Sequence, residues 1–386
     1  MIGEKKCQTP HVMSDELFNI EQIRLRVISP INAKEPFYDA TMGPFQKFEL
    51  AILELEDESG FTGACEFPID KIYLLENTFI PILLNAPKMN YSNLFEKLFW
   101  SIRNNGFRGD SALALGHLDR VFYDLAAKRE NLPLYKYLGG TTNYVRAYAS
   151  GGGINFSGNY LLEECLKYEE EGYETIKIKS GGLKTSVKED VERISMVREA
   201  LKQETKLAID ANQSMTLKKS LELVHELSFM DIAWLEEPIH SASLMEIEEL
   251  CKNTSIKISY GESERSSKVF PSIIRSGVSH VQPIVGHISS FRDWLSIADY
   301  AKENKLDFSS GGNSFFNCQF VRAAGDFALL EFLQPVVGIF SEFFITKPSI
   351  ENGNFIFPEI PGIGVLVDWE RLKREKLIKF SKKWRC

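Results

Sequence analysis

The sequence predicts an α/β protein, in which a (β/α)8 barrel of the TIM type carries an N-terminal α+β capping domain that a C-terminal segment completes. Three observations lead to this prediction. Strand-like alternation dominates the first part of the chain, and eight short apolar runs alternate with amphipathic helices after about residue 143. Polar and charged residues follow several of these runs directly, at the strand ends where TIM barrels place their active sites.

The first region, residues 1–142, predicts the α+β capping domain. Ile23–Ile28 and Phe48–Leu55 alternate apolar and polar residues as half-buried antiparallel strands do. Ser111–Glu130 repeats apolar residues at three- and four-residue steps, and Leu138-Gly139-Gly140 ends the helical pattern. We expect residues 1–19 to be a loosely packed leader, since the first residues are polar and lack the apolar segment of a secretion signal.

The second region, residues 143–345, predicts the barrel, and residues 346–386 predict a segment that returns to the capping domain. An open doubly wound sheet is the alternative, but the repeats lack the glycine-rich phosphate loop typical of such sheets. The eight expected strands are Val145–Ala149, Thr175–Lys179, Leu207–Asp210, Ile232–Leu235, Lys257–Tyr260, His280–Ile284, Leu306–Ser309 and Val336–Phe340.

The composition of the chain argues against several classes of function. The formal net charge is -8 and the two signs are interspersed, which argues against nucleic-acid binding. No apolar run approaches the roughly 18 residues needed to span a bilayer. The six cysteines are scattered without metal-binding spacing, as in a protein with reduced thiols. We therefore expect a cytoplasmic protein.

Three carboxylates indicate a metal site. Asp210, Glu236 and Glu262 each end an apolar run, and each lies 26 residues after the one before. Adjacent barrel strands would direct all three into one mouth, where a cation would relieve their repulsion. Oxygen ligands favour Mg²⁺ over Zn²⁺ or Cu²⁺, with Mn²⁺ as an alternative. The structural alternative is that each acid caps the following helix.

Two lysines on the second strand indicate acid–base chemistry. Lys177 and Lys179 are two residues apart and therefore face the same side, here the barrel interior. Repulsion and burial would both lower a lysine pKa and suit one of the pair to act as a general base. We expect Lys179, nearer the mouth, to be the base and Lys177 to balance the carboxylates. A purely electrostatic role for both is the alternative.

In these features the sequence resembles the enolase superfamily, in its mandelate racemase/muconate lactonizing enzyme branch, from about Ile23 to Trp369. The resemblance rests on five motifs in the family order. They are Asp124-Leu125-Ala126-Ala127-Lys128 with Leu138-Gly139-Gly140, Lys177-Ile178-Lys179, Asp210, Glu236-Glu237-Pro238 with Glu262, and Pro361-Gly362-Ile363-Gly364-Val365. The resemblance implies that the second lysine of the pair is the acid/base catalyst and that the three carboxylates bind the metal.

The sequence departs from this family on the far side of the expected pocket. Racemases of this branch carry a second base, either a lysine on the sixth strand or an Asp–His pair on strands six and seven. Here Gln282 or Ile284 stands at that place on the sixth strand, and the seventh, 308–313, has no histidine. His287 is the nearest ionisable replacement. Glu342, after the expected eighth strand, matches a carboxylate near the substrate in some relatives. A capping or loop role is the alternative for both.

The sequence thus predicts an enzyme that abstracts the proton next to a substrate carboxylate and stabilises the resulting enediolate with Mg²⁺ and Lys177. Asn212 would orient the base or a metal-bound water, and the loop from Glu35 to Gly43 would close over the mouth. Candidate pocket walls are Phe37, Tyr38 and Phe316.

For the reaction, the sequence first suggests racemisation or epimerisation of an amino-acid-like or dipeptide acid. The alternatives are a lyase, either o-succinylbenzoate synthase-like or an acid-sugar dehydratase, and a catalytically silent metal-binding barrel. The expected partner is a small carboxylate. By analogy with the family, we also expect a homo-oligomer.

Overall fold

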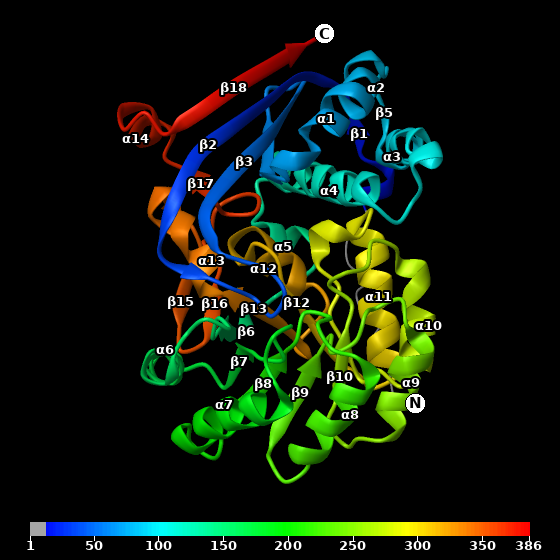
Figure 1. The fold of residues 1–386 in the computed structure, drawn as a ribbon. Helices are drawn as coiled ribbons and strands as arrows, with labels where there is room; N and C mark the ends of the chain where they lie inside the picture. Colours follow the sequence, from blue (N-terminus) through cyan, green and yellow to red (C-terminus); the bar gives the residue numbers. More distant parts are fainter. Residues whose placement is uncertain (1–12) are drawn as a thin grey trace, which may run out of the picture.

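The computed structural model describes residues 13–386, which form an antiparallel capping domain above a closed barrel (Figure 1). The capping sheet has the order β18-β2-β3-β4. Its strands are β2 (Ile20–Phe37), β3 (Phe45–Asp57), β4 (Thr62–Phe67) and β18 (Ile378–Arg385). The C-terminal strand β18 pairs with β2, with Trp384 opposite Ile23, so the end of the chain does return to the capping domain.

Helices cover one side of this sheet. They are α1 (Ile72–Leu74), α2 (Ile80–Asn85), α3 (Tyr91–Ser101), α4 (Asp110–Arg129) and α5 (Leu134–Tyr137). The helix predicted at 111–130 is α4, which is buried along nearly its whole length. It can be buried on all sides because the sheet packs on one face and the barrel loops on the other.

The start of the described chain differs from the expected loose leader. Residues 1–12 lie outside the described range, and nothing tests that part of the prediction. Met13 is fully buried, and β1 (Leu17–Phe18) pairs with β5 (Met89–Asn90), so residues 13–19 are packed. Within 13–386, no helix has the length and apolar character needed to cross a membrane.

Eight parallel strands close into the barrel, because β13 pairs with β6, with Glu331 opposite Tyr148. The strands are β6 (Tyr144–Gly151), β7 (Thr175–Lys179), β8 (Lys206–Asp210), β9 (Ile232–Glu236), β10 (Ile258–Tyr260), β11 (His280–Val281), β12 (Asp307–Ser310) and β13 (Ala328–Leu333). The predicted eighth strand at 336–340 is wrong. That segment is helical, in α13 (Gln334–Val337) and the 3-10 turn η7 (Gly338–Phe343), since Pro335 favours a helix start.

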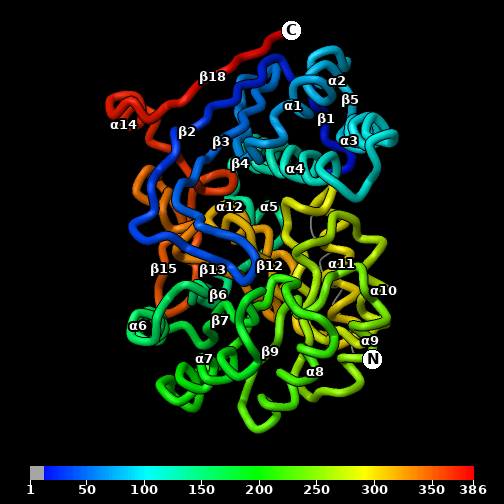
Figure 2. The backbone as a smooth tube through the Cα atoms, viewed as in Figure 1, coloured from blue at the N-terminus to red at the C-terminus, as the bar shows by residue number. Residues whose placement is uncertain are grey.

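Helices surround the barrel, as the backbone tube in Figure 2 shows. They are α6 (Gly158–Glu170), α7 (Val187–Ala200), α8 (Leu217–Glu226), α9 (Leu244–Lys252), α10 (Phe270–Arg275), α11 (Phe291–Glu303) and α12 (Ser314–Arg322). Several begin at polar caps. Ser186 and Glu189, for example, form a reciprocal capping box at the start of α7.

The last part of the chain ties the two domains together. It contains β14 (Phe344–Thr346), β15 (Ser349–Glu351), β16 (Asn354–Ile356), β17 (Leu366–Val367) and α14 (Trp369–Arg374). Asp124 of α4 accepts hydrogen bonds from the backbone N–H groups of Ala64 and Ile363, both at 2.6 Å. Two of the five sequence motifs therefore meet at one buried carboxylate.

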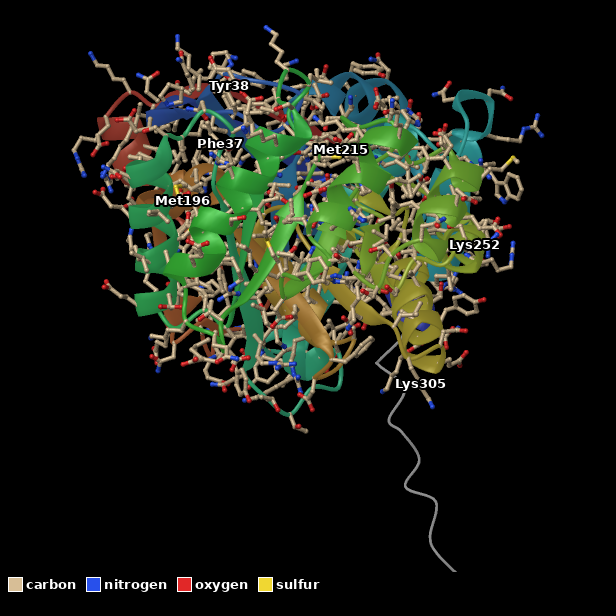
Figure 3. All side chains as sticks on the ribbon, turned by 60° about the horizontal axis from the view of Figure 1, so that its bottom comes forward. Phe37, Tyr38, Met196, Met215, Lys252 and Lys305 are labelled. Atoms are coloured by element: carbon tan, nitrogen blue, oxygen red, sulfur yellow. The ribbon has the colours of Figure 1, made fainter. Side chains whose placement is uncertain are left out.

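A long hairpin carries the capping domain down onto the barrel. Its tip, the loop 38–44 between β2 and β3, is fixed to three barrel loops. Tyr38 O accepts from Ile154 N at 2.9 Å, and Ala40 O accepts from Leu183 N at 3.2 Å. The N–H of Ala40 donates to Asn212 Oδ1 at 3.3 Å. Figure 3 shows Phe37 and Tyr38 toward the same end of the molecule as Met215 of the β8–α8 loop.

Candidate active site

The three predicted carboxylates lie on adjacent strands at the C-terminal mouth of the barrel. Asp210 ends β8 and Glu236 ends β9, and the two are paired in register. Glu262 follows β10 by two residues. Asp210 and Glu236 are buried and Glu262 is half-buried, and all three lie at the same end of neighbouring strands.

Both lysines of β7 project into this mouth and form ion pairs with the carboxylates. Lys177 Nζ lies 2.6 Å from Glu236 Oε1 and 3.4 Å from Asp210 Oδ2. Lys179 Nζ forms a hydrogen-bonded ion pair with Asp210 Oδ2. Lys177 is thus the more deeply enclosed of the two, with carboxylates on several sides, and Lys179 has one carboxylate partner.

A fourth carboxylate, Glu331, was missed by the sequence prediction. It lies on β13, and its Oε1 is 2.8 Å from Lys177 Nζ. Because the eighth strand was predicted at 336–340, Glu342 was taken as the acid that follows it. The sequence feature that could have identified Glu331 is a single acid within an otherwise apolar run, Ala328-Leu329-Leu330-Glu331-Phe332-Leu333. An acid in such a run is costly to bury unless it is paired, and Lys177 supplies the partner.

Glu342 lies elsewhere. Its side chain is 59% exposed in η7, and its Oε2 pairs with Arg371 Nη2 of α14 at 2.9 Å.

Phe316 also lies away from the mouth, in the core, with its ring edge-on to Phe344. Of the other proposed pocket walls, Phe37 is buried against Phe156, and Tyr38 is half-buried in the hairpin tip.

The mouth carries more carboxyl groups than cationic side chains. Burial and the neighbouring Asp210 charge raise the pKa of Glu236 to about 8. Burial, with Glu237 and Asp210 nearby, also raises the pKa of Glu262 well above its ordinary value. Glu237 is buried with Oε1 lacking a hydrogen-bond partner. Carboxylates in this state indicate that a positive charge is missing from the set.

A hard divalent cation fits this donor set. Among residues 13–386, no three histidine, cysteine or acidic side chains stand close enough to enclose a metal as they are. The reason is local, because Lys177 and Lys179 hold the oxygens of Glu236 and Asp210. Asp210, Glu236 and Glu262 offer only oxygen donors, which are the ligands that Mg²⁺ prefers.

The lysine pKa values differ from the sequence prediction. Burial acts to lower the pKa of Lys179, but the charges of Asp210, Glu262 and Glu331 together outweigh it, and the pKa lies above its ordinary value. The pKa of Lys177 is likewise held well above its ordinary value, because Glu236 and Glu331 outweigh burial. Repulsion between the two lysines is therefore smaller than their attraction to the carboxylates.

Asn212 connects the mouth to the capping hairpin. Its backbone N–H donates to Asp210 Oδ1 at 2.9 Å, and its side-chain Nδ2 lies 3.3 Å from Asp210 Oδ2. Its Oδ1 accepts from Ala40 N. The backbone of Asn212 is left-handed, with φ 43°, a conformation that asparagine tolerates. Asn212 thus orients Asp210, the expected metal ligand, and also holds the loop above it.

The opposite wall of the mouth is neutral. Gln282 Nε2 donates to Glu236 Oε2 at 2.9 Å, and its Oε1 accepts from Ser259 Oγ, so this amide is fully engaged. Ile284 is buried and apolar. Directly after β12, a Cβ at Gly311 would collide with Glu331 Oε2, so a side chain at that position would displace the Glu331 carboxylate.

His287 is near the site but weakly basic. It lies in the 3-10 turn η6 (Val285–His287), and its Nδ1 donates to Glu262 O at 3.1 Å. Burial and the Arg265 charge lower the pKa of His287 to about 3. The ring is therefore neutral at physiological pH and faces His117 of α4, with 6.3 Å between the ring centroids.

Comparison with known proteins agrees with the fold. The family profile described as enolase C-terminal domain-like matches residues 160–371, more than half of the chain. The chain belongs to the enolase superfamily, in the mandelate racemase/muconate lactonizing enzyme group. Its relatives are metal-dependent isomerases and lyases, and this protein is an enzyme of that superfamily.

Several proteins in this family are similar over most of the chain. Arabinonate dehydratase of Saccharolobus solfataricus is 27% identical over 83% of this chain and 88% of its own. The 3,6-anhydro-alpha-L-galactonate cycloisomerase of Streptomyces coelicolor is 25% identical over 87% of this chain and 94% of its own. The crystal structure of a racemase from Streptomyces coelicolor A3(2), with bound magnesium, superposes with a TM-score of 0.85. It is 24% identical and covers 93% of this chain and 99% of its own.

Proposed function

We propose that this enzyme removes the α-proton of an α,β-dihydroxy acid with Lys179 and then expels the β-hydroxyl group as water. The reaction class is thus a Mg²⁺-dependent dehydratase (lyase). The observation that carries this proposal is the asymmetry of the mouth. Acid–base groups stand on β7, whereas the opposite wall on β11 and β12 presents Gln282, Ile284 and Gly311.

Asp210, Glu236 and Glu262 would hold the metal ion, which supplies positive charge to the substrate carboxylate and to the enediolate that forms from it. With Asp210 engaged as a ligand, Lys179 loses its ion-pair partner, and burial then lowers its pKa toward the working range of a base. Lys177, held by Glu236 and Glu331, stays protonated and places a second positive charge beside the enediolate.

A single base is sufficient for this elimination of water. Lys179 Nζ takes the α-proton, and the C–H electron pair enters the carboxylate. The same lysine, now an ammonium, returns that proton to the β-oxygen as the C–O bond breaks. Water leaves from the face on which the proton was removed, and the enol tautomerises to a 2-keto acid. Racemisation, the first expectation from the sequence, needs a second proton donor on the other face. The described part of the β11–β12 wall offers no such group apart from the weakly basic His287.

The relatives support this reaction. The curated similar proteins named above include a dehydratase and a cycloisomerase of sugar acids. Neither has more than 27% identity, so they support the reaction class and leave the substrate open.

The proposal is tested by incubating pooled sugar acids, N-acyl amino acids and dipeptides with the enzyme and Mg²⁺ in D₂O. We expect deuterium incorporation next to the carboxylate, or 2-keto acid formation, from hydroxy acids. Both should disappear with chelator and in Lys179→Arg, which keeps the charge and lacks a usable base. Exchange confined to amino-acid derivatives would contradict the proposal, as would a total lack of exchange with Mg²⁺ tightly bound.

A further inference from the structure

A cavity lies at the end of the barrel opposite the catalytic mouth, where the parallel strands begin. Its volume is about 670 Å³, within the roughly 300–1,000 Å³ range of small-molecule sites. Its lining includes Thr175, Lys206 and Asp307, which are the first residues of β7, β8 and β12. By contrast, Lys179 and Asp210 of the catalytic mouth end β7 and β8. This lower cavity is therefore a separate opening of the barrel.

An aromatic and apolar floor closes the lower cavity toward the catalytic mouth. Trp234 and His280 line it and are almost fully buried, and their rings meet edge-on with 4.5 Å between the centroids. Trp234 Nε1 donates to Glu236 Oε2 at 3.1 Å, so the polar edge of the indole is already occupied on the side of the mouth. Ile232 and Leu329 add apolar surface to the lining. The floor can therefore pack against the apolar part of a ligand.

Alternation along the strands directs two cations into the lower cavity, since residues an even number of positions apart face the same side. Lys206 lies four positions before the inward-facing Asp210 on β8. Arg146 lies two positions before Tyr148 on β6, which stands opposite Glu331 inside the barrel. Both cations line the cavity, and among residues 13–386 neither forms an ion pair. The guanidinium of Arg146 donates only to a backbone oxygen, at 2.9 Å.

The acidic residues at this end do not balance these two cations. Asp307 faces inward on β12, and its carboxylate forms an ion pair with Lys257. Glu174 and Asp231 also line the cavity, but each directly precedes the inward-facing first residue of a strand. The alternation therefore starts their side chains toward the outer face of the barrel. The interior of the lower cavity is left with an excess of positive charge.

Two buried polar side chains of the lower cavity lack hydrogen-bond partners. Thr175 is 5% exposed, and its hydroxyl makes no hydrogen bond to another described residue. Its strand, β7, lies between β6 and β8, so Arg146 and Lys206 flank it. His280 Nε2 lies 3.0 Å from Ser309 Oγ, whereas its Nδ1 has no partner. Because buried polar groups without partners are costly, these two side chains favour occupation of the cavity.

We propose that the lower cavity is a second ligand site, which binds a small organic acid with an apolar body and one anionic group. The anionic group lies between Arg146 and Lys206 and accepts a hydrogen bond from the Thr175 hydroxyl, while the apolar body packs on Trp234. A cationic ligand would be repelled by the two unpaired cations, and a neutral ligand would leave them without a counter-ion. The site does not depend on the reaction proposed for the catalytic mouth.

Three ligands of similar shape test the charge preference by calorimetry. They are 3-phenylpropanoate, 3-phenylpropanamide and 3-phenylpropylamine, which are anionic, neutral and cationic. Each is titrated into the full chain with chelator, so that no metal ion can hold a carboxylate at the catalytic mouth. We expect 3-phenylpropanoate to bind at least about tenfold more tightly than the amide, and the amine to bind most weakly. Inorganic phosphate, which lacks the apolar body, should bind at least about tenfold more weakly than 3-phenylpropanoate.

Variants assign this preference to the lower cavity. Arg146→Gln combined with Lys206→Gln changes two exposed residues, so the fold should persist. We expect the affinity for 3-phenylpropanoate to fall about tenfold or more, and that for the amide to stay within about threefold. The matched control Lys188→Gln with Lys218→Gln removes the same charge from exposed positions on α7 and α8, and should change affinity by less than about twofold. Thr175→Val should weaken binding of the anion about fivefold.

Tryptophan fluorescence locates the ligand at the floor. Binding of 3-phenylpropanoate should change this fluorescence with the affinity found by calorimetry. Trp234→Phe should remove the change and still bind the ligand. Lys179→Ala, at the catalytic mouth, should leave the affinity within about twofold, because Lys179 does not line the lower cavity.

Each contrary outcome overturns a stated part of the proposal. If neither 3-phenylpropanoate nor phosphate binds saturably, the lower cavity is not a ligand site and holds only water. Equal or tighter binding of the amide or the amine would refute the anionic group, and equal or tighter binding of phosphate would refute the apolar body. An unchanged affinity in Arg146→Gln/Lys206→Gln, or a large loss in Lys179→Ala, would show that the acid binds elsewhere.

Discussion

The two walls of the barrel mouth differ in their chemistry, although both are built from the same alternation of strand and helix. From β7 to β10 the mouth carries five ionisable groups, Lys177, Lys179, Asp210, Glu236 and Glu262, and both lysines form ion pairs with carboxylates of this set. On β11 and β12 it carries neutral groups that are hydrogen-bonded or packed. Under the proposed mechanism, this difference confines proton transfer to the face of the substrate that meets Lys179, while Gln282 and Ile284 enclose the other face.

The largest expected effect comes from the charged wall. Lys179→Ala should lower the rate of α-proton exchange by about 10³-fold or more, because Lys179 is the proposed base. Lys179→Arg should lower the exchange rate by as much, which would show that Lys179 acts as a base and not only as a positive charge. The rate is measured by mass spectrometry in D₂O. Exchange in Lys179→Arg within tenfold of the parent enzyme would mean that another group is the base.

Metal affinity offers a direct comparison of the two walls. Asp210→Asn should weaken Mg²⁺ binding by more than about 100-fold, because a charged ligand is replaced by a neutral one. Ile284→Ala, on the neutral wall, should leave Mg²⁺ affinity within about threefold. Both are measured by calorimetric titration. Similar losses in the two variants would show that the walls are not functionally distinct.

A third prediction separates stability from chemistry at the junction of the domains. Asp119 of α4 is buried, accepts from Tyr91 of α3 and bonds to Phe291 N of α11 at 2.7 Å. Burial raises the pKa of Asp119 to about 7. The folded protein therefore keeps a proton that the unfolded chain releases above about pH 4, and stability falls as pH rises from about 4 to about 7.

Asp119→Asn should remove this contribution to the pH dependence, which is on the order of 2–4 kcal/mol. Urea unfolding of both proteins at pH 5 and pH 7.5 provides the measurement. The parent enzyme should lose more stability than the variant between these values. Parallel changes in the two proteins would mean that Asp119 is not protonated in the folded state at pH 5.

The smallest effect is expected at Asn212. Asn212→Ala removes the side-chain hydrogen bonds to Asp210 Oδ2 and to Ala40 N in the hairpin tip. Loss of the second, worth about 1 kcal/mol, should shift the loop toward an open state about fivefold. We expect faster proteolysis within 38–44 and a raised KM. A matched Asn155→Ala variant, which removes the hydrogen bond to Tyr38 N, should have a similar effect on proteolysis without touching Asp210.

The charged wall could be predicted from the sequence because local signals encode it. A strand's alternation places Lys177 and Lys179 on one face, and the regular spacing of Asp210, Glu236 and Glu262 reflects the repeat of the barrel. The eighth strand could not be placed correctly, because the apolar runs at 328–333 and 336–340 are similar in composition. For the same reason, Glu331 was not predicted as a site residue.

Contacts between residues far apart in the sequence account for the difference between the predicted and observed lysine pKa values. The lysine pKa values depend on distances to Asp210 and Glu236 that no local pattern contains.

The central claim is that proton transfer occurs on one face only, and the stereochemistry of exchange tests it most directly. A single stereoisomer of a substrate identified in the D₂O screen is incubated with enzyme and Mg²⁺, and its α-carbon is followed by chiral chromatography and NMR. We expect deuterium at that carbon with retained configuration, or a 2-keto acid, and no accumulation of the α-epimer. Formation of the α-epimer at a rate comparable to exchange would reveal a second proton donor and contradict the account.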